Sequence, residues 1–180
     1  MNRVDRWLQR WRIRVAGPYV PKGARVLDVG CADGVLARLI PGISHYVGID
    51  PDATERQTEN VTIIRGVFPD DLPESPPFDV ITMLAVLEHV PEAEQAVVAN
   101  ACARALKPNG RLLITTPAPI VDHLLGVLRF FRIVDGMAVE QHHGFEPCQT
   151  PSIFAEPGFV LIRRRRFQLG LNSLFVFRRP

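Results

Sequence analysis

Short apolar runs rich in Val and Ile recur along the first two thirds of the chain. They cover residues 25–29, 45–49, 61–64, 79–84 and 111–115. The runs are continuous rather than alternating, which is typical of parallel strands that are covered on both faces. Between them, Val35–Leu39, Ala53–Thr58 and Glu92–Leu106 are expected to be helical. This alternation within 180 residues predicts an α/β protein with one doubly wound, mostly parallel sheet in a single domain.

The C-terminal part of the chain departs from this alternation. Phe159–Phe167 and Leu174–Phe177 are two strand-like runs about six residues apart, and Gly170 lies between them. Such spacing predicts an antiparallel hairpin. Leu174–Phe177 is apolar at every position, so it should be an interior strand. Arg163–Arg166 are four consecutive charges, which belong on an edge strand, where they discourage further pairing.

The first 16 residues have the pattern of a cationic amphipathic helix. Apolar residues recur at helical spacing at Val4, Trp7, Leu8, Trp11 and Val15. Four arginines share another face, namely Arg3, Arg6, Arg10 and Arg14. This pattern suits a helix that lies on an anionic membrane, and it equally suits a helix that folds over a binding cleft. We favour the cleft cover and keep peripheral membrane contact through residues 1–16 as the alternative.

The composition excludes a disordered chain, because 47% of the residues are hydrophobic and 22% are charged. The net charge of +2 averages opposed segments: residues 1–25 and 163–179 are strongly basic, and residues 50–94 are strongly acidic. No aromatic stacking platform accompanies the basic segments, so we expect no nucleic-acid partner. No apolar stretch approaches the ~20 residues of a membrane-spanning helix.

The three cysteines, Cys31, Cys102 and Cys148, are an odd number at wide spacing. They fit neither a disulfide framework nor a metal site and favour the reducing cytoplasm. We therefore expect a cytoplasmic protein, with membrane contact limited to the periphery. Nothing in the sequence defines the oligomeric state.

The segment Val26–Gly34, VLDVGCADG, is the most informative motif. It predicts a strand that runs into a glycine-bearing turn before a helix, where the backbone can approach a ligand closely. The dinucleotide fingerprint G-x-G-x-x-G fails, because Ala32 and Val35 occupy the places of its second and third glycines. Sixteen residues past Gly34, Asp50 ends the second strand, where a carboxylate can accept both hydroxyls of a ribose.

Four blocks in this order resemble class I S-adenosylmethionine-dependent methyltransferases, especially the group that includes quinone-biosynthesis enzymes. They are VLDVGCADG (26–34), VGIDP (47–51), FDVITMLAVLEHV (78–90) and RALKPNGRLLITTP (104–117). The resemblance covers roughly residues 24–178. It implies a Rossmann-like methyltransferase fold of seven strands, with the last strand antiparallel and inserted beside the sixth. It also implies S-adenosyl-L-methionine as the cofactor.

The resemblance assigns parts of the cofactor to particular residues. The methionine part would lie on the turn that contains Asp28, Gly30, Cys31, Ala32 and Gly34, and the ribose would lie on Asp50 beside Pro51. Leu84 and Ala85 would border the sulfonium. Family members often have Gly at position 32, so Ala32 is expected to fit if its φ is negative. The family's acidic residue near the adenine is missing, and we favour Phe68 over Val67 as the residue that packs on the ring.

Candidate bases are histidines. His89 could act as a general base, or Glu88 and His89 could simply cap and solvate the following turn, which we favour. One of His142 and His143, with His143 as the candidate, could also serve as a base; otherwise both are ordinary loop residues. Their spacing matches no metal signature, so no metal is expected.

Residues 118–140 form an insertion with a helical apolar surface. It could pack on the sheet or act as a lid over an apolar substrate. The sequence therefore predicts methyl transfer from S-adenosylmethionine to a small acceptor, apolar or aromatic, at oxygen or carbon. A nicotinamide-dependent oxidoreductase is disfavoured by the broken glycine fingerprint. A non-catalytic S-adenosylmethionine-binding pseudoenzyme or complex partner remains the alternative.

Overall fold

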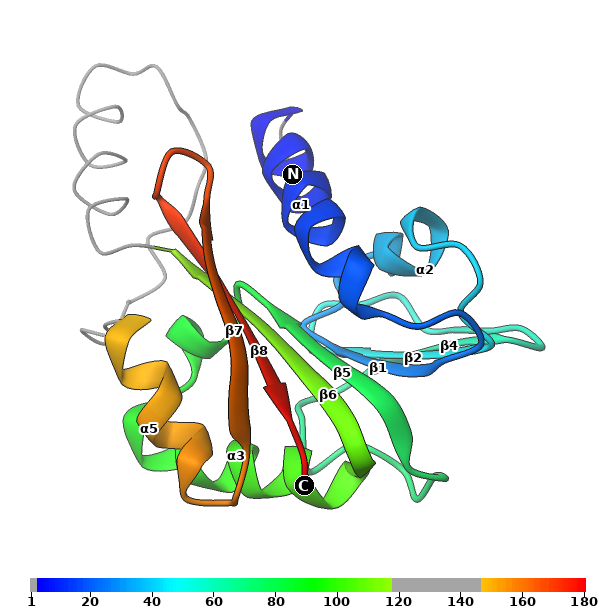
Figure 1. The fold of residues 1–180 in the computed structure, drawn as a ribbon. Coiled ribbons are helices and arrows are strands. Elements are labelled where there is room, and N and C mark those ends of the chain that lie inside the picture. The colour runs from blue at the N-terminus through cyan, green and yellow to red at the C-terminus, as the bar shows by residue number, and fades with distance from the viewer. Residues whose placement is uncertain (1–2, 118–146) are drawn as a thin grey trace.

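The computed structural model describes residues 3–117 and 147–180. The insertion 118–140 and the histidines His142 and His143 lie outside these residues, so the expectations for them stay untested. In the described part, a central sheet has helices on both faces (Figure 1). Helices α1 (Arg3–Ala16) and α2 (Val35–Leu39) lie on one face, and α3 (Glu92–Ala105) and α5 (Thr150–Ala155) lie on the other. This arrangement confirms the doubly wound α/β prediction.

Eight strands of the described residues form one sheet in the order β3-β4-β2-β1-β5-β6-β8-β7. Their bounds are β1 Arg25–Val29, β2 His45–Asp50, β3 Arg56–Gln57, β4 Val61–Arg65, β5 Phe78–Leu84, β6 Leu106–Pro117, β7 Val160–Phe167 and β8 Asn172–Arg178. Three short 3-10 turns, η1 Gly17–Tyr19, η2 Leu87–His89 and η3 Pro147–Gln149, connect other elements. Strands β4, β2, β1, β5 and β6 pair in parallel. All five runs predicted as parallel strands are therefore confirmed.

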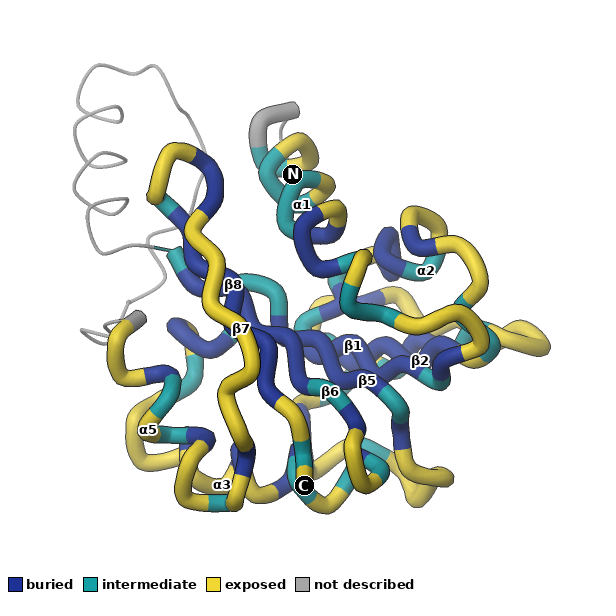
Figure 2. The backbone as a smooth tube through the Cα atoms, in the orientation of Figure 1, coloured by how far each residue is buried: buried dark blue, intermediate teal, exposed yellow. Residues whose placement is uncertain are grey.

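The predicted hairpin is confirmed as well. β8 pairs antiparallel with β6 on one side and with β7 on the other, so it is inserted between them. All but the last residue of β8 are buried, whereas β7 is exposed along its length up to Arg166 and forms an edge of the sheet (Figure 2). The Arg164 guanidinium lies over the Phe175 ring at 5.0 Å. The four arginines thus lie where the charge pattern predicted.

The helix predicted over Ala53–Thr58 is wrong. Instead, β3 (Arg56–Gln57) pairs antiparallel with β4, with Arg56 opposite Ile63 and Gln57 opposite Thr62. The segment has only Ala53 as an apolar residue to bury, and a six-residue helix is unstable without an apolar face. Pairing with the neighbouring strand satisfies its backbone better, and this short strand is the eighth beside the seven expected.

The core consists of two clusters, one on each face of the sheet. The cluster under α3 and α5 contains Phe78, Phe154 and Phe177, and the cluster under α1 and α2 contains Ile13, Leu36 and Val176. Only the C-terminal part of α1 enters the core: Ile13, Val15 and Ala16 are buried, whereas Trp7 is 56% exposed. Within the described residues, none of the helices is long and apolar enough to span a membrane.

Candidate cofactor site

The turn after β1 has the conformation for which the sequence supplies glycine. Gly30 and Gly34 have φ of 71° and 67°, in the left-handed region. A Cβ atom on Gly30 would overlap Val86, and one on Gly34 would lie 2.6 Å from Cδ1 of Ile63. Both positions therefore favour glycine for conformation; Gly30 also needs it for space, whereas at Gly34 the end of the Ile63 side chain could move aside. The Gly30 N–H donates to the Ile49 carbonyl at 2.9 Å and holds the turn against β2.

Ala32 contradicts the expectation of a negative φ. Its φ is 48°, so it is one of the non-glycine residues of the described chain with left-handed backbone. The Ala32 N–H donates to Oδ2 of Asp50 at 2.9 Å, and this bond joins the turn to the end of β2. An L-residue is less favourable than glycine in this conformation. The alanine is therefore accommodated with strain.

Asp50 lies at the carboxyl end of β2, directly against the glycine turn. Its two carboxylate oxygens each accept one backbone N–H at 2.9 Å, from Ala32 and from Asp52. Each oxygen keeps a further lone pair, and the residue is only half-buried. A carboxylate fixed in this way can accept the two hydroxyls of a ribose. Pro51 follows on the surface, where its carbonyl accepts from Nε of Arg65.

Asp28 is held inside the sheet rather than at its surface. Oδ2 accepts from the Tyr46 hydroxyl at 2.7 Å and Oδ1 accepts from the Thr82 hydroxyl at 2.6 Å. Burial raises the pKa of Asp28 to about 6; the two hydroxyl bonds lower the pKa, and the Asp50 charge raises it. The carboxylate links β1 to both neighbouring strands below the turn. Tyr46 and Thr82 were missed in the sequence, because only the strand register places them beside Asp28.

Cys31 packs beneath the turn. Its Sγ lies where a Cβ atom on Gly48 would come within 2.6 Å, which explains the glycine in β2. Burial is the largest cause that raises the pKa of Cys31 to about 12, and the charges of Asp28 and Asp50 add to it. The group is therefore a thiol at neutral pH and a packing residue. The three cysteines all lie in the described ranges, and none of them forms a disulfide.

Leu84 and Ala85 end β5 on the other side of the turn. Leu84 lies opposite Thr115 of β6, and the Ala85 N–H donates to the Thr115 carbonyl at 2.9 Å. Val86 follows and lies against Gly30, so the end of β5 adjoins the glycine turn. No sequence signal singled out Val86. The structure thus brings Gly30, Asp50 and Leu84–Ala85 together at the carboxyl ends of β1, β2 and β5.

Glu88 and His89 both belong to η2 and differ in burial. Glu88 is buried, whereas the side chain of His89 is exposed. Glu88 faces α1: burial lowers the pKa of Arg12, and the charges of Glu88 and Asp5 oppose this change. Arg12 of α1 therefore lies near enough to Glu88 of η2 for the two charges to interact. His89 stays a candidate base by prediction only.

Phe68 lies in the segment after β4 and is 7% exposed, as a member of the core cluster on the α3 side. Its neighbour Val67 is 54% exposed, and its N–H donates to Oδ2 of Asp71 at 2.7 Å. Contact between Phe68 and an adenine stays a prediction. Among the described residues, no group of three or more His, Cys, Asp or Glu side chains could hold a metal ion.

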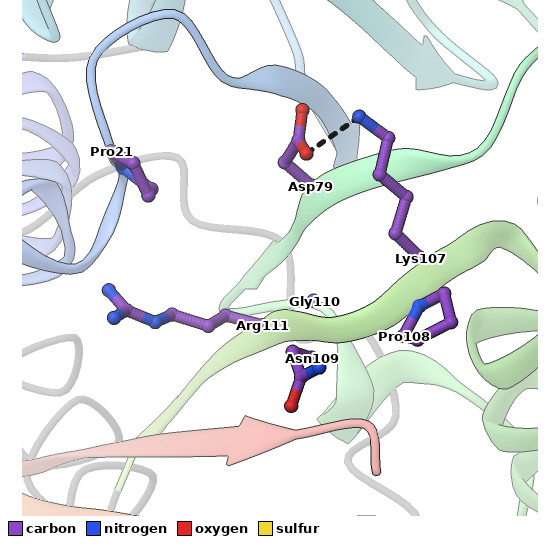
Figure 3. Close-up of a pocket in the computed structure, with 7 residues that line it drawn as sticks. All are labelled: Pro21, Asp79, Lys107, Pro108, Asn109, Gly110 and Arg111. Carbon is purple, nitrogen blue, oxygen red and sulfur yellow. Dashed lines mark hydrogen bonds and ion pairs between the residues drawn. The ribbon is translucent and has the colours of Figure 1, made fainter.

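A separate hollow lies at the amino ends of β5 and β6 (Figure 3). Lys107 donates to Asp79 at 2.7 Å, and Arg111 donates to the Tyr19 carbonyl at 2.9 Å. The charged groups of this hollow are therefore paired within the protein. The residues described above lie at the opposite, carboxyl end of the strands, where ligands bind in open α/β sheets.

The glycine turn, Asp50 and the end of β5 fit S-adenosylmethionine: a closely approachable backbone for its methionine part, an oriented carboxylate for its ribose, and small or apolar residues near its sulfonium. Together with an antiparallel β8 inserted beside β7, this site and fold define the class of S-adenosylmethionine-dependent methyltransferases. A model of the family described as methyltransferase domain matches residues 2–154. The chain belongs to this family.

Curated relatives agree with this assignment. Over 106 residues, 53% of this chain, it is 35% identical to a ubiquinone biosynthesis O-methyltransferase of Alkalilimnicola ehrlichii and covers 42% of that protein. Over 120 residues, 59% of this chain, it is 36% identical to the enzyme of the same name from Idiomarina loihiensis and covers 48% of it. The chain thus spans less than half the length of these relatives.

Solved structures share the fold. Magnesium protoporphyrin IX methyltransferase of Synechocystis PCC 6803, with bound SAH, matches with a TM-score of 0.71 at 16% identity, covering 100% of this chain and 89% of that one. The N-methyltransferase NodS of Bradyrhizobium japonicum matches with a TM-score of 0.65 at 15% identity, covering 99% and 98%. The predictions of family, fold and cofactor are confirmed.

Proposed function

We propose that this chain transfers the methyl group of S-adenosylmethionine to a small acceptor that is apolar or aromatic, at an oxygen or carbon atom. One observation carries the proposal: the Asp50 carboxylate is fixed by the Ala32 N–H at the edge of the sheet where β5 also ends. The relatives named above are O-methyltransferases, which favours oxygen as the methylated atom.

When bound, the cofactor supplies an electrophilic methyl group on a positively charged sulfur. The contribution of the chain is then mainly alignment. Asp50 would orient the ribose, the glycine turn would hold the methionine part, and Leu84 and Ala85 would exclude water from the reacting atoms. For a hydroxyl acceptor, the exposed His89 is the described residue that we propose to remove its proton.

Helix α1 is proposed as a cover of the acceptor side. Ile13, Val15 and Ala16 are buried against the sheet, and Arg12 lies near enough to Glu88 of η2 for the two charges to interact. The exposed Trp7 and the exposed arginines Arg6, Arg10 and Arg14 support the alternative of contact with an anionic membrane.

The second candidate is a protein that binds S-adenosylmethionine without turnover. It is favoured by the connections around β4, which contain no helix in the described residues: β2 leads to β4 through β3, and β4 leads to β5 through residues 66–77 without a regular element. The connections on the adenine side of the site therefore consist of the short strand β3 and loops. Binding without methyl transfer to any phenol or catechol of an acceptor series would favour this candidate.

Calorimetry with S-adenosylmethionine, S-adenosylhomocysteine and NAD tests the proposal. We expect the first two to bind and NAD not to bind. Asp50→Ala should weaken binding at least tenfold, because two hydroxyl bonds to a charged acceptor are lost. Phe68→Ala in the same series tests the adenine contact, and Asp52→Ala is a matched control, because only its backbone N–H contacts Asp50. Folded protein that binds no methyl donor would refute the proposed function.

A further inference from the structure

Three buried polar side chains at the carboxyl end of β6 and the start of β8 lack hydrogen-bond partners at one atom each. They are Oγ1 of Thr115, Nε2 of Gln168 in the turn before β8, and Oδ1 of Asn172. Oγ1 of the adjacent Thr116 also lacks a partner, but Thr116 lies on the opposite face of the sheet. The exposed fractions of these residues are 0%, 6% and 4%. Nearly all buried polar atoms in proteins are paired, so a group of unpaired ones needs an explanation.

Thr115 and Asn172 lie on one face of the sheet, and Gln168 is hydrogen-bonded to Asn172 from the hairpin turn. Neighbouring residues along a strand alternate between faces, so Thr115 shares its face with Leu113, and Asn172 shares its face with Leu174 and Val176. These apolar residues belong to the core cluster that also contains Ile13 of α1 and Leu36 of α2. Thr115 lies opposite Leu174 in the β6–β8 ladder, and Asn172 lies opposite Pro117, two residues further along. Thr115 and Asn172 are therefore diagonal neighbours on the side that α1 covers.

The two amides form a matched pair. Nδ2 of Asn172 donates to Oε1 of Gln168, which leaves the carbonyl oxygen of Asn172 and the NH2 group of Gln168 without partners. Whichever way the two amides are turned, a single bond between them leaves one carbonyl oxygen and one NH2 group without partners. A hydroxyl or a carboxamide satisfies such a pair, because each of these groups both donates and accepts. A carboxylate offers no donor, and an ammonium offers no acceptor.

The turn of the β7–β8 hairpin positions Gln168 in this pair. Gln168 and Leu169 have φ of 53° and 56°, although neither is glycine. Leu169 is fully exposed, but the side chain of Gln168 is buried in the same turn. The end of the hairpin and α1 rise from the same end of the sheet (Figure 1). The Gly170 N–H donates to the Phe167 carbonyl at 3.1 Å, so Gln168 and Leu169 are the central residues of a type I′ hairpin turn, in which both φ values are positive. The turn thus places the buried Gln168 side chain beside Asn172.

The position relative to the cofactor residues sets the size of the ligand. Thr115 is paired directly with Leu84, which ends β5 beside the glycine turn. β8 lies two strands from β5, about 10 Å at the usual spacing, and Asn172 lies two residues, about 7 Å, along β8 from Leu174, which is level with Thr115 and Leu84. The backbones at Leu84 and Asn172 are therefore about 12 Å apart. That distance is spanned by one aromatic ring with its substituents. A methyl-accepting atom near Leu84 would thus place a substituent on the far side of the ring near Asn172.

We propose that Gln168 and Asn172, with Thr115 beside them, bind a neutral hydroxyl or carboxamide group of the acceptor, one ring's width from the methylated atom. This inference rests on the proposed methyl transfer. It narrows the acceptor from a small aromatic or apolar molecule to one with a second, uncharged polar substituent. The residues contact this substituent and determine specificity, and they take no part in the chemistry.

Side-chain amide resonances of isotope-labelled protein, saturated with S-adenosylhomocysteine, provide the test. Hydroquinone and benzamide are the probes, and 1,4-dimethoxybenzene, which accepts but does not donate, is the matched control ligand. We expect both probes to shift the Gln168 and Asn172 amide resonances saturably, and the dimethoxy compound to bind at least tenfold more weakly. The double variant Gln168→Leu/Asn172→Leu should bind all three compounds equally, and Thr115→Val should reduce the discrimination. Leu169→Ala in the same turn should change nothing.

Two results separate this inference from the proposed function. If S-adenosylhomocysteine binds but neither probe shifts the amides, or all three compounds bind equally to the wild type, the inference is overturned and the function stands. If the folded protein does not bind S-adenosylhomocysteine, yet the probes bind the amide pair selectively, the function is overturned and a polar binding site remains. Unchanged discrimination in the double variant also overturns the inference, and unfolding curves establish that this variant is folded.

Discussion

Replacing Asp28 by Asn should stabilise the protein at neutral pH and remove a pH dependence of its stability. The carboxyl group is 5% exposed, and burial raises its pKa from 3.8 to about 6. Between about pH 4 and pH 6, the folded state retains a proton that the unfolded state has lost, so the free energy of unfolding falls as the pH rises. The stabilising effect of the protonated group is complete below about pH 4 and is lost above about pH 6.

The two pKa values of Asp28 determine the magnitude. Their difference corresponds to about 3 kcal/mol between the acidic and the neutral limit. Asn is uncharged at every pH, and the hydroxyls of Tyr46 and Thr82, which donate to the carboxylate, can rotate so that one accepts from the new amide. Asp28→Asn should therefore exceed the wild type at pH 7 by up to about 3 kcal/mol, or about 6–12 °C in Tm.

Urea unfolding of both proteins at pH 4, 5, 6 and 7 measures this effect. The difference between variant and wild type cancels the titration of distant carboxylates. It should grow from near zero at pH 4 to its full value at pH 7. Asp33→Asn, in an exposed pair with Arg38 at 3.1 Å, is the control and should change stability by less than about 1 kcal/mol at each pH. A difference that is constant with pH, or a variant less stable than the wild type at pH 7, would refute the reasoning.

Two further predictions concern the glycine turn and α1. Ala32→Gly should raise the free energy of unfolding by about 1 kcal/mol, because it relieves a φ of 48°, whereas Ala37→Gly inside helix α2 should lower it by about the same amount. Thermal unfolding measures both changes. If Ala32→Gly and Ala37→Gly changed the free energy of unfolding in the same direction, the turn at Ala32 would not be strained. Charge reversal of the exposed Arg6, Arg10 and Arg14 to Glu should not alter sedimentation with anionic liposomes if α1 is a cover. Sedimentation of the wild type that this variant loses would instead support the membrane alternative.

The sequence determined the strands of the parallel sheet, the hairpin and the place of the glycine turn. These features depend on local information: continuous apolar runs, glycines at fixed spacing, and four consecutive arginines at an edge. The family resemblance depended on the same blocks, and the match over residues 2–154 confirms it. Such blocks define the backbone that approaches the cofactor, so the cofactor could be inferred before the structure was known.

Only the tertiary structure decided what depends on strand register and pairing. Residues 53–58 pair with β4 instead of forming a helix, because a neighbouring strand satisfies their backbone. The register places Tyr46 and Thr82 against Asp28, which turns a residue of the motif into a buried carboxyl group with a raised pKa. Ala32, whose N–H donates to Asp50, has a positive φ that its residue type disfavours. The amide pair of Gln168 and Asn172 likewise has no signal in the sequence. It is recognised only from the burial of the two side chains and from their unpaired polar atoms.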